Sequence, residues 1–186
     1  MNITQTEFQG LVIIEPEVSE DARGCFFESY NRRTLERAGI RTVFVQDNQS
    51  FSRHGVVRGL HFQAPPHAQA KLIRVLEGTV FDVAVDLRRG APSFGKWFGM
   101  ELSAENRRQL YIPQGFAHGF SVLSAQAVVL YKCDDFYHPS SERGIRYNDP
   151  QLGIRWNIDD TQAVVSEKDL LLPPFEEDTD YFIFTP

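Results

Sequence analysis

Short apolar segments separated by turn-forming residues recur about every ten residues between Lys71 and Cys133, and this spacing restricts the fold more than any other feature. The clearest segment is 79–87. Its positions 81, 83, 85 and 87 are apolar, while Asp82, Ala84 and Asp86 fall on the other face of a strand. Short strands at this spacing are typical of antiparallel sandwiches and barrels rather than of βαβ units. The sequence therefore predicts a mainly β, antiparallel barrel or sandwich with a few short helices.

The expected strands are the β-branched and aromatic segments bounded by turn residues, at 11–14, 25–30, 42–46, 71–76, 79–87, 97–102, 109–113, 120–123 and 127–133. Glu77-Gly78 predicts a hairpin between two of them. The polar residues 47–50 are expected to end the strand before them, and 113–120 to form a turn that leads into the strand at 120–123. The clearest helix is Arg32–Ala38, with Asn31 as its N-cap and Gly39 closing it.

Composition and charge limit the classes of function. A chain of 186 residues is most simply one domain, and its net charge of −6 disfavours a nucleic-acid binder that depends on neutralising phosphates. No apolar run of about 18 residues predicts a membrane span, and residues 1–10 lack the regions of a signal peptide. A cytoplasmic protein is expected, with Cys25 and Cys133 as free thiols. The 15 phenylalanines indicate a sheet with a subunit contact.

The segment 55–63 carries the first candidate site residues, Arg58 and His61. In a regular strand they would lie on opposite faces, but Gly59 between them is where a bend would change that. A histidine fixed on a strand is a natural proton acceptor near neutral pH, although a core histidine bonded to a backbone carbonyl fits this segment equally well.

Three further polar residues fall on or near the other expected strands, namely Lys71, His118 and Tyr131, and Asp169 lies further along the chain. Singly, each has a structural explanation: a surface charge, a turn histidine, a buried phenol and a helix-start carboxylate. Together with Arg58 and His61, they supply what carbanion chemistry beside a carbonyl requires, namely a base, a cation for the enolate and a second acid.

A metal site is not expected. Pro113-x-Gly115-x-x-His118 resembles the second motif of a cupin barrel, but the histidine pair of the first motif is missing, since Phe62 and Gln63 follow His61. A catalytic metal needs about three protein ligands, and His61, His118 and Glu77 would be an improvised set. A catalytic metal ion is therefore not expected.

Many segments together resemble the dTDP-4-dehydrorhamnose 3,5-epimerase family, in register over about residues 8–175. They are Gln46-Asp47-Asn48, 55–63, 71–75, 80–87, 92–97, 102–106, 109–120, Tyr131-Lys132-Cys133 and Ser166-Glu167-Lys168-Asp169. The resemblance implies a homodimer of cupin-like jelly-roll barrels, each with its core at about residues 40–140. It also implies a metal-free epimerase without an organic cofactor, acting on a dTDP-linked 4-keto-6-deoxyhexose in dTDP-L-rhamnose biosynthesis.

The resemblance also implies roles for individual residues. His61 would be the base, Asp169 its orienting carboxylate, Lys71 the cation at the enolate oxygen and Tyr131 the acid on the opposite face. Tyr137 would stack on the thymine. Substrate contacts are implied for Arg23, Phe26, Glu28, Gln46, Asp47, Asn48, Arg58, Lys71, His118, Tyr137, Glu142 and Lys168.

Three alternatives stay open. One is a monoepimerase of a related sugar, because Cys25, Phe51 and Tyr147 depart from the family pattern. Another is a catalytically silent sugar-nucleotide-binding cupin. The third is a metal-dependent cupin dioxygenase or isomerase.

Overall fold

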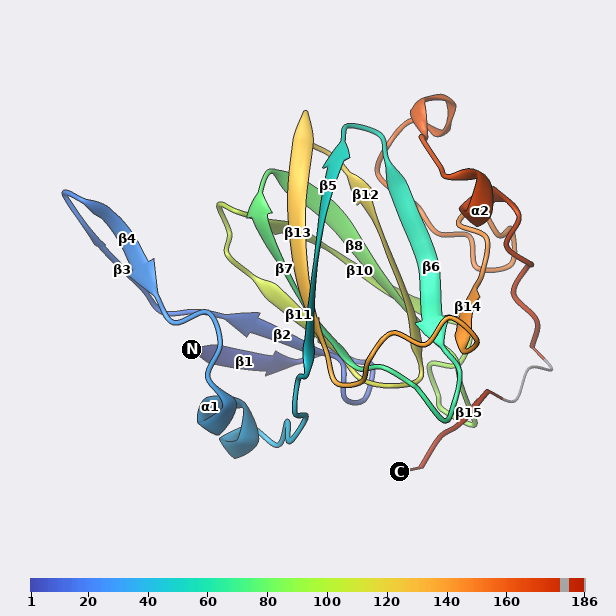
Figure 1. The fold of residues 1–186 in the computed structure, drawn as a ribbon, viewed down its shortest axis with the longest axis horizontal. Coiled ribbons are helices and arrows are strands. Elements are labelled where there is room, and N and C mark those ends of the chain that lie inside the picture. The colour runs from blue at the N-terminus through green and yellow to red at the C-terminus, as the bar shows by residue number, and fades with distance from the viewer. Residues whose placement is uncertain (178–180, 186) are drawn as a thin grey trace.

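Two antiparallel sheets make up the body of the protein. A computed structural model describes residues 1–177 and 181–185 (Figure 1). The six-stranded sheet has the order β1 (Asn2–Gln5), β2 (Val12–Glu15), β11 (Gln109–Ile112), β7 (Lys71–Glu77), β13 (Gln126–Cys133), β5 (Gln46–Arg53). The five-stranded sheet has the order β10 (Trp97–Ser103), β8 (Thr79–Asp86), β12 (Phe116–Val122), β6 (Val57–Gln63), β14 (Glu142–Gly144). The chain passes back and forth between the sheets, so the expected mainly β, cupin-like antiparallel jelly roll is confirmed.

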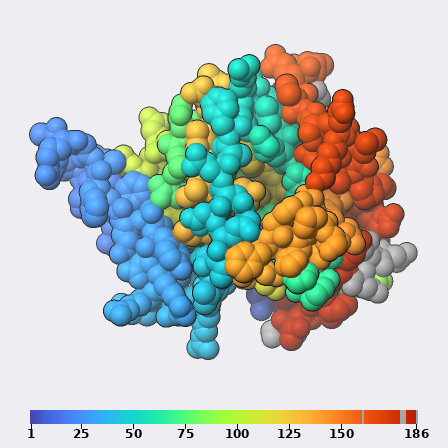
Figure 2. Space-filling model, viewed as in Figure 1, coloured from blue at the N-terminus to red at the C-terminus, as the bar shows by residue number. Residues whose placement is uncertain are grey.

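Few elements lie outside these sheets. β3 (Val18–Asp21) and β4 (Gly24–Phe27) form a hairpin, the arm, which stands off the body of the molecule in Figure 2. Two short strands, β9 (Arg88–Arg89) and β15 (Phe182–Ile183), pair in parallel. The helical elements are α1 (Arg32–Arg37), the 3₁₀ turn η1 (Asp160–Gln162) and α2 (Glu167–Leu170). Among the described residues, none of the helices has the length and apolar character needed to span a bilayer.

The main apolar core lies between the sheets, where Ile73, Leu110 and Val129 of one sheet pack with Val80 and Phe120 of the other. A second apolar cluster covers the outer face of the five-stranded sheet. There, buried side chains of β6 and β8 pack against Leu152, Trp156 and Phe175 of the C-terminal segment. This arrangement buries both faces of β8, including the face that carries Asp82 and Asp86.

The helix expected at Arg32–Ala38 is confirmed and ends one residue early, at Arg37. Asn31 caps it because its side-chain oxygen accepts hydrogen bonds from the backbone N–H groups of Arg33 and Thr34. Gly39 follows the helix with φ of +89°, a conformation that suits glycine at a helix end.

The hairpin expected at Glu77-Gly78 is wrong. β7 and β8 are consecutive strands but belong to different sheets, so the chain turns a corner between the layers at Gly78. Gly78 has φ of +77°, and a side chain there would collide with the backbone oxygen of Gln126. Gly78, which suggested a hairpin turn, therefore allows the sharp turn by which the chain passes from one sheet to the other.

The strand expected at 42–46 is also wrong. Residues 42–45 are irregular, because Phe44 packs on the rings of Tyr30 and Tyr111, and the Thr42 hydroxyl bonds to that of Tyr111 at 2.7 Å. The strand is instead the polar segment Gln46–Arg53, which pairs along its whole length with β13. Pairing with a long partner here outweighs low intrinsic β propensity. The turn expected over 113–120 is shorter, since β12 begins at Phe116 and places His118 within a strand.

Candidate active site

A cavity of about 350 Å³ lies between the two sheets. The six-stranded sheet contributes polar side chains from β5, together with Lys71 of β7 and Tyr131 of β13. The five-stranded sheet contributes Arg58 and His61 of β6, His118 of β12 and Glu142 of β14. The cavity therefore has two walls, and its titratable groups come from both.

Arg58 and His61 share this cavity because β6 is not regular between them. His61 pairs with His118, and Arg58 pairs with Phe120. Between these two pairs, β6 has one more residue than β12. The extra residue of such a β-bulge shifts the alternation, so that the side chains beyond it point to the opposite face of the sheet. Gly59 makes the bulge possible, since it has φ of +112° and a Cβ there would lie 2.7 Å from the backbone of Gly119. The bend considered for Gly59 is confirmed.

His61 is held by a buried carboxylate. Its Nε2 lies 2.8 Å from Oδ1 of Asp169, which is 4% exposed. Ser166 caps α2 by accepting the N–H of Asp169, and the other carboxylate oxygen of Asp169 accepts the N–H of Gly59. Burial raises the pKa of Asp169, but the hydrogen bonds from His61 and Gly59 outweigh it and leave that pKa below its ordinary value. Asp169 is therefore a fixed negative charge behind the imidazole.

Lys71 begins β7 deep in the cavity, with Nζ 3.4 Å from the backbone oxygen of His61 and 5.9 Å from the centre of the Tyr131 ring. Burial lowers the pKa of the Lys71 ammonium, and charge interactions with Cys133, Asp82 and Glu142 oppose the shift. Burial also raises the pKa of the Tyr131 phenol, so the hydroxyl keeps its proton near neutral pH.

A second histidine and carboxylate pair lies beside the first. Nε2 of His118 is 2.9 Å from Oδ2 of Asp82, and Asp82 is completely buried. Within the described chain, the other oxygen of Asp82 has no hydrogen-bond partner. An unpaired buried carboxylate oxygen is unusual, and here its charge lies near Lys71.

At the mouth of the cavity, Glu142 accepts hydrogen bonds from the hydroxyl of Tyr137 at 2.7 Å and from Nζ of Lys168 at 2.6 Å. Burial raises the pKa of Glu142, but these two donors outweigh it and lower the pKa overall. The backbone N–H of Tyr137 also donates to the side chain of Gln46, which ties this loop to β5.

Comparisons with known proteins identify relatives of this chain. Residues 5–177 match the family model described as dTDP-4-dehydrorhamnose 3,5-epimerase. A protein of that name from Pseudomonas aeruginosa is 55% identical over 170 residues, which cover 91% of this chain and 93% of the relative.

The chain belongs to the dTDP-4-dehydrorhamnose 3,5-epimerase family.

Solved structures of family members have the same fold. The epimerase from Elizabethkingia anophelis is 52% identical, with a TM-score of 0.91 over 96% of this chain and 98% of that one. An epimerase from Legionella pneumophila in complex with dTDP-4-keto-L-rhamnose is 51% identical, with a TM-score of 0.86 over 94% of this chain and 98% of that one.

The structure brings most of the predicted site residues of this family member together. The cavity is lined by Gln46, Asn48, Arg58, His61, Lys71, His118, Tyr131, Tyr137 and Glu142. Asp169 lies directly behind His61, and Lys168 reaches the site through Glu142.

Four predicted residues are not brought into the cavity. Asp47 points to the other face of β5 and pairs with Lys132 at 2.9 Å, because neighbouring residues of a strand face opposite ways. Arg23, Phe26 and Glu28 belong to the arm and the residue just after it, and all three are exposed. Arg23 pairs with Asp21 in the arm itself, and Phe26 is 78% exposed.

Sequence reasoning missed several residues that line the cavity, chiefly Ser50, Gln63 and Gln69. It also assigned no role to Asp82, the partner of His118. A signal for Asp82 was available, because Asp82 and Asp86 interrupt a mostly apolar strand. A carboxylate in such a strand is rarely buried without a partner.

The improvised metal set is not assembled. His61 and His118 are paired across the strands, but Glu77 is exposed at the far end of β7, where it accepts a hydrogen bond from Gln126. In the described residues, these three side chains form no common ligand group.

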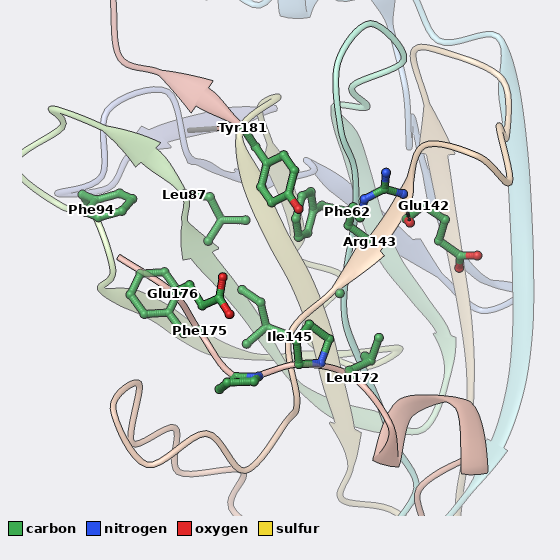
Figure 3. A pocket seen from close by; sticks show the side chains of 13 residues that line it. Phe62, Leu87, Phe94, Glu142, Arg143, Ile145, Leu172, Phe175, Glu176 and Tyr181 are labelled. Carbon is green, nitrogen blue, oxygen red and sulfur yellow. Dashed lines mark hydrogen bonds between the residues drawn. The ribbon is translucent and has the colours of Figure 1, made fainter. Parts of the chain in front are cut away.

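A second cavity, of about 220 Å³, lies on the outer face of β14 and shares Phe62 and Glu142 with the first. Figure 3 shows its apolar lining, with Leu87, Ile145, Phe175 and Tyr181 around the space and the carboxylate of Glu142 pointing away from these side chains. Its lining is mostly apolar, with Glu142, Arg143 and Glu176 as its charged residues.

Proposed function

We propose that this chain inverts C3 and C5 of dTDP-4-dehydro-6-deoxy-D-glucose, giving dTDP-4-dehydro-L-rhamnose in the cytoplasm for dTDP-L-rhamnose biosynthesis. The observation that carries the proposal is that His61 and Tyr131 line one cavity from opposite sheets, and that Lys71, on the same sheet as Tyr131, reaches the backbone oxygen of His61. Epimerisation removes a proton from one face of the sugar and returns one to the other, so it needs two such groups.

His61 is the base for the protons beside the C4 ketone. With Nε2 held by Asp169, Nδ1 is the ring nitrogen left to accept a proton. The carboxylate of Asp169 fixes the imidazole tautomer and stabilises the imidazolium that forms, as oriented histidines require.

Lys71 stabilises the enolate. When the proton leaves, negative charge develops on the C4 oxygen, and a fixed ammonium in a poorly solvated cavity stabilises it strongly. Since Lys71 supplies this charge, we propose that the reaction requires neither a metal ion nor an organic cofactor. Tyr131 then donates its phenolic proton from the opposite wall to complete inversion.

The nucleotide is bound toward the mouth of the cavity. Arg58 is positioned by Ser52 and by the backbone oxygen of Phe51, and its guanidinium suits a diphosphate. Gln46, Asn48 and His118 offer further polar contacts, and Tyr137 offers a ring for the thymine. A local group of cations thus lets a chain of net charge −6 bind an anion.

We propose a homodimer in which the arm completes the cavity of the partner. Phe26 is 78% exposed on an arm that stands off the body of the molecule, and Arg23 and Glu28 are exposed on or just after the same arm. Each chain of 186 residues would act as one domain. Light scattering tests this directly: a dimer is expected, and a monomer that epimerises at full rate would contradict the role of the arm.

The function is tested by incubating the protein with dTDP-4-dehydro-6-deoxy-D-glucose and following the sugar ring by proton NMR. The expected product has inverted configuration at both C3 and C5. Inversion at one carbon would instead indicate a monoepimerase, and an unchanged sugar that still binds would indicate a silent binding protein. Repeating the assay after chelator treatment tests the metal-free mechanism, with no loss of rate expected.

A further inference from the structure

We propose that His67, Asp135 and His138 form a binding site for one divalent transition-metal ion of the zinc type, separate from the epimerisation chemistry. His67 lies in the loop between β6 and β7, and the other two lie between β13 and β14. One ligand atom from each of the three residues lies within 4.8 Å of the others. Among the described residues this is the one group of three or more such side chains close enough to share an ion.

The ligand types suit this class of ion. Two imidazoles and one carboxylate are the donors that zinc and its neighbours in the first transition row accept, with a further position left for water. Nδ1 of His67 lies 3.2 Å from Oδ2 of Asp135. All three side chains are half-buried, so an ion can reach them while part of their hydration is already removed.

The two histidine rings stack, with 3.4 Å between their centres and 13° between their planes. Lone pairs in two parallel planes do not converge on one ion, so binding requires one ring to turn about its Cβ–Cγ bond.

The backbone around the site is already fixed by the amide side chains of Gln63 and Gln69. Nε2 of Gln63 donates to the backbone oxygens of His67 at 2.7 Å and Phe136 at 3.1 Å, and its Oε1 accepts the N–H of His138 at 2.6 Å. Gln69 donates to the backbone oxygen of Asp135 at 2.7 Å. Because Gln63 is 4% exposed, these hydrogen bonds hold the two loops together without an ion. Ion binding then requires only that one imidazole ring rotates.

The site also has a defined relation to the cavity between the sheets. Gln63 and Gln69, which hold its backbone, line that cavity, and Tyr137 precedes His138. His67, Asp135 and His138 do not line the cavity themselves, so an ion here ties together two loops of the cavity wall without sharing a ligand with the His61 and Asp169 pair. The sequence carried no sign of it, because the ligands at 67, 135 and 138 lack the regular spacing of a metal motif.

The test uses the full chain without a histidine tag. Zn²⁺ binding is measured by titration calorimetry, and Co²⁺ binding by its visible absorption. One equivalent per chain is expected for the wild type. His67→Asn and His138→Asn should each weaken binding by more than about tenfold, because even the loss of a group that only orients a metal ligand costs about 10–100-fold in affinity. Circular dichroism and a thermal melt of each variant confirm that it is folded.

Two matched controls use the other histidines of the chain. His54→Asn removes an exposed ring that contacts the backbone oxygens of Leu123 and Ser124, and it should bind Zn²⁺ like the wild type. His61→Asn removes a histidine of the substrate cavity and should also bind normally. The proposal is overturned if the wild type binds no ion, or if binding falls in either control while the His67 and His138 variants retain it.

Discussion

His61 and His118 are direct cross-strand partners on β6 and β12, and each is bonded through Nε2 to a buried aspartate. The two pairs differ in access. The side chain of His61 is 32% exposed into the cavity, whereas that of His118 is only 7% exposed. We therefore assign proton abstraction to His61 and a binding role to His118.

Asp169→Asn should lower kcat by about 10²–10⁴-fold, because the amide leaves the imidazole without a fixed tautomer or a counter-charge. KM should change little, since Asp169 lies behind His61 and does not line the cavity. Steady-state kinetics of the folded variant measures both constants. A variant with unchanged kcat would contradict the positioning role of this carboxylate.

Asp82→Asn tests the second pair. The negative charge of Asp82 raises the pKa of Lys71, so removing it should lower that pKa further. Because the ammonium form is the one that stabilises the enolate, the alkaline fall of activity should move to lower pH. A pH profile of kcat/KM checks the direction, and an unmoved or upward-shifted alkaline limb would show that Asp82 does not act on Lys71.

Tyr131→Phe should still exchange protons beside the ketone but should fail to complete inversion at C5, because the phenol that returns the proton is missing. NMR of the product separates exchange from inversion. Tyr111→Phe is the matched control, since the Tyr111 hydroxyl bonds to Thr42 outside the cavity and its loss should leave inversion intact. Normal turnover of Tyr131→Phe would mean that another group is the acid.

Lys71→Met should lower activity by about 10²–10³-fold, the usual effect of removing a fixed charge from a developing oxyanion. Lys132→Met is its control, because Lys132 pairs with Asp47 away from the cavity. Activity that survives in Lys71→Met would place the enolate cation elsewhere.

The same variant has a stability consequence. Burial lowers the folded pKa of Lys71, so between that lowered value and the unfolded value of about 10.4 the unfolded chain binds more protons. The free energy of unfolding therefore rises with pH through this window, and the penalty for burying the ammonium is fully present below it. Lys71→Met should be more stable than the wild type near neutral pH, and urea denaturation at neutral and alkaline pH should show the difference shrinking as the pH rises.

Alternation and turn residues were enough to predict most strands, the α1 helix and the antiparallel class. These patterns failed where the same local sequence fits two different arrangements of the strands. Glu77-Gly78 is as good a corner between sheets as a hairpin turn, and only the positions of the other strands decide between them. Likewise, the polar residues of Gln46–Arg53 do not predict a strand by themselves. The segment is a strand because it pairs with β13.

The site was predicted through resemblance more than through pattern. Periodicity places Arg58 and His61 on opposite faces, and they share a cavity because one glycine accommodates an extra residue in β6. Asp169 is 108 residues from His61 in the chain, so no spacing rule connects them. Alternation placed Asp82 on the more polar face of its strand. That face is buried because the opposing sheet covers it, which the strand's own sequence does not indicate.

The most direct test of the account is deuterium exchange by His61→Asn. In D₂O with dTDP-4-dehydro-6-deoxy-D-glucose, the wild type and the control His54→Asn should incorporate deuterium at both C3 and C5, as measured by mass spectrometry and NMR. His61→Asn should exchange at least about 10²-fold more slowly at both carbons, because the base that removes the protons is gone. Exchange by His61→Asn at the wild-type rate would contradict the assignment of His61 as the base.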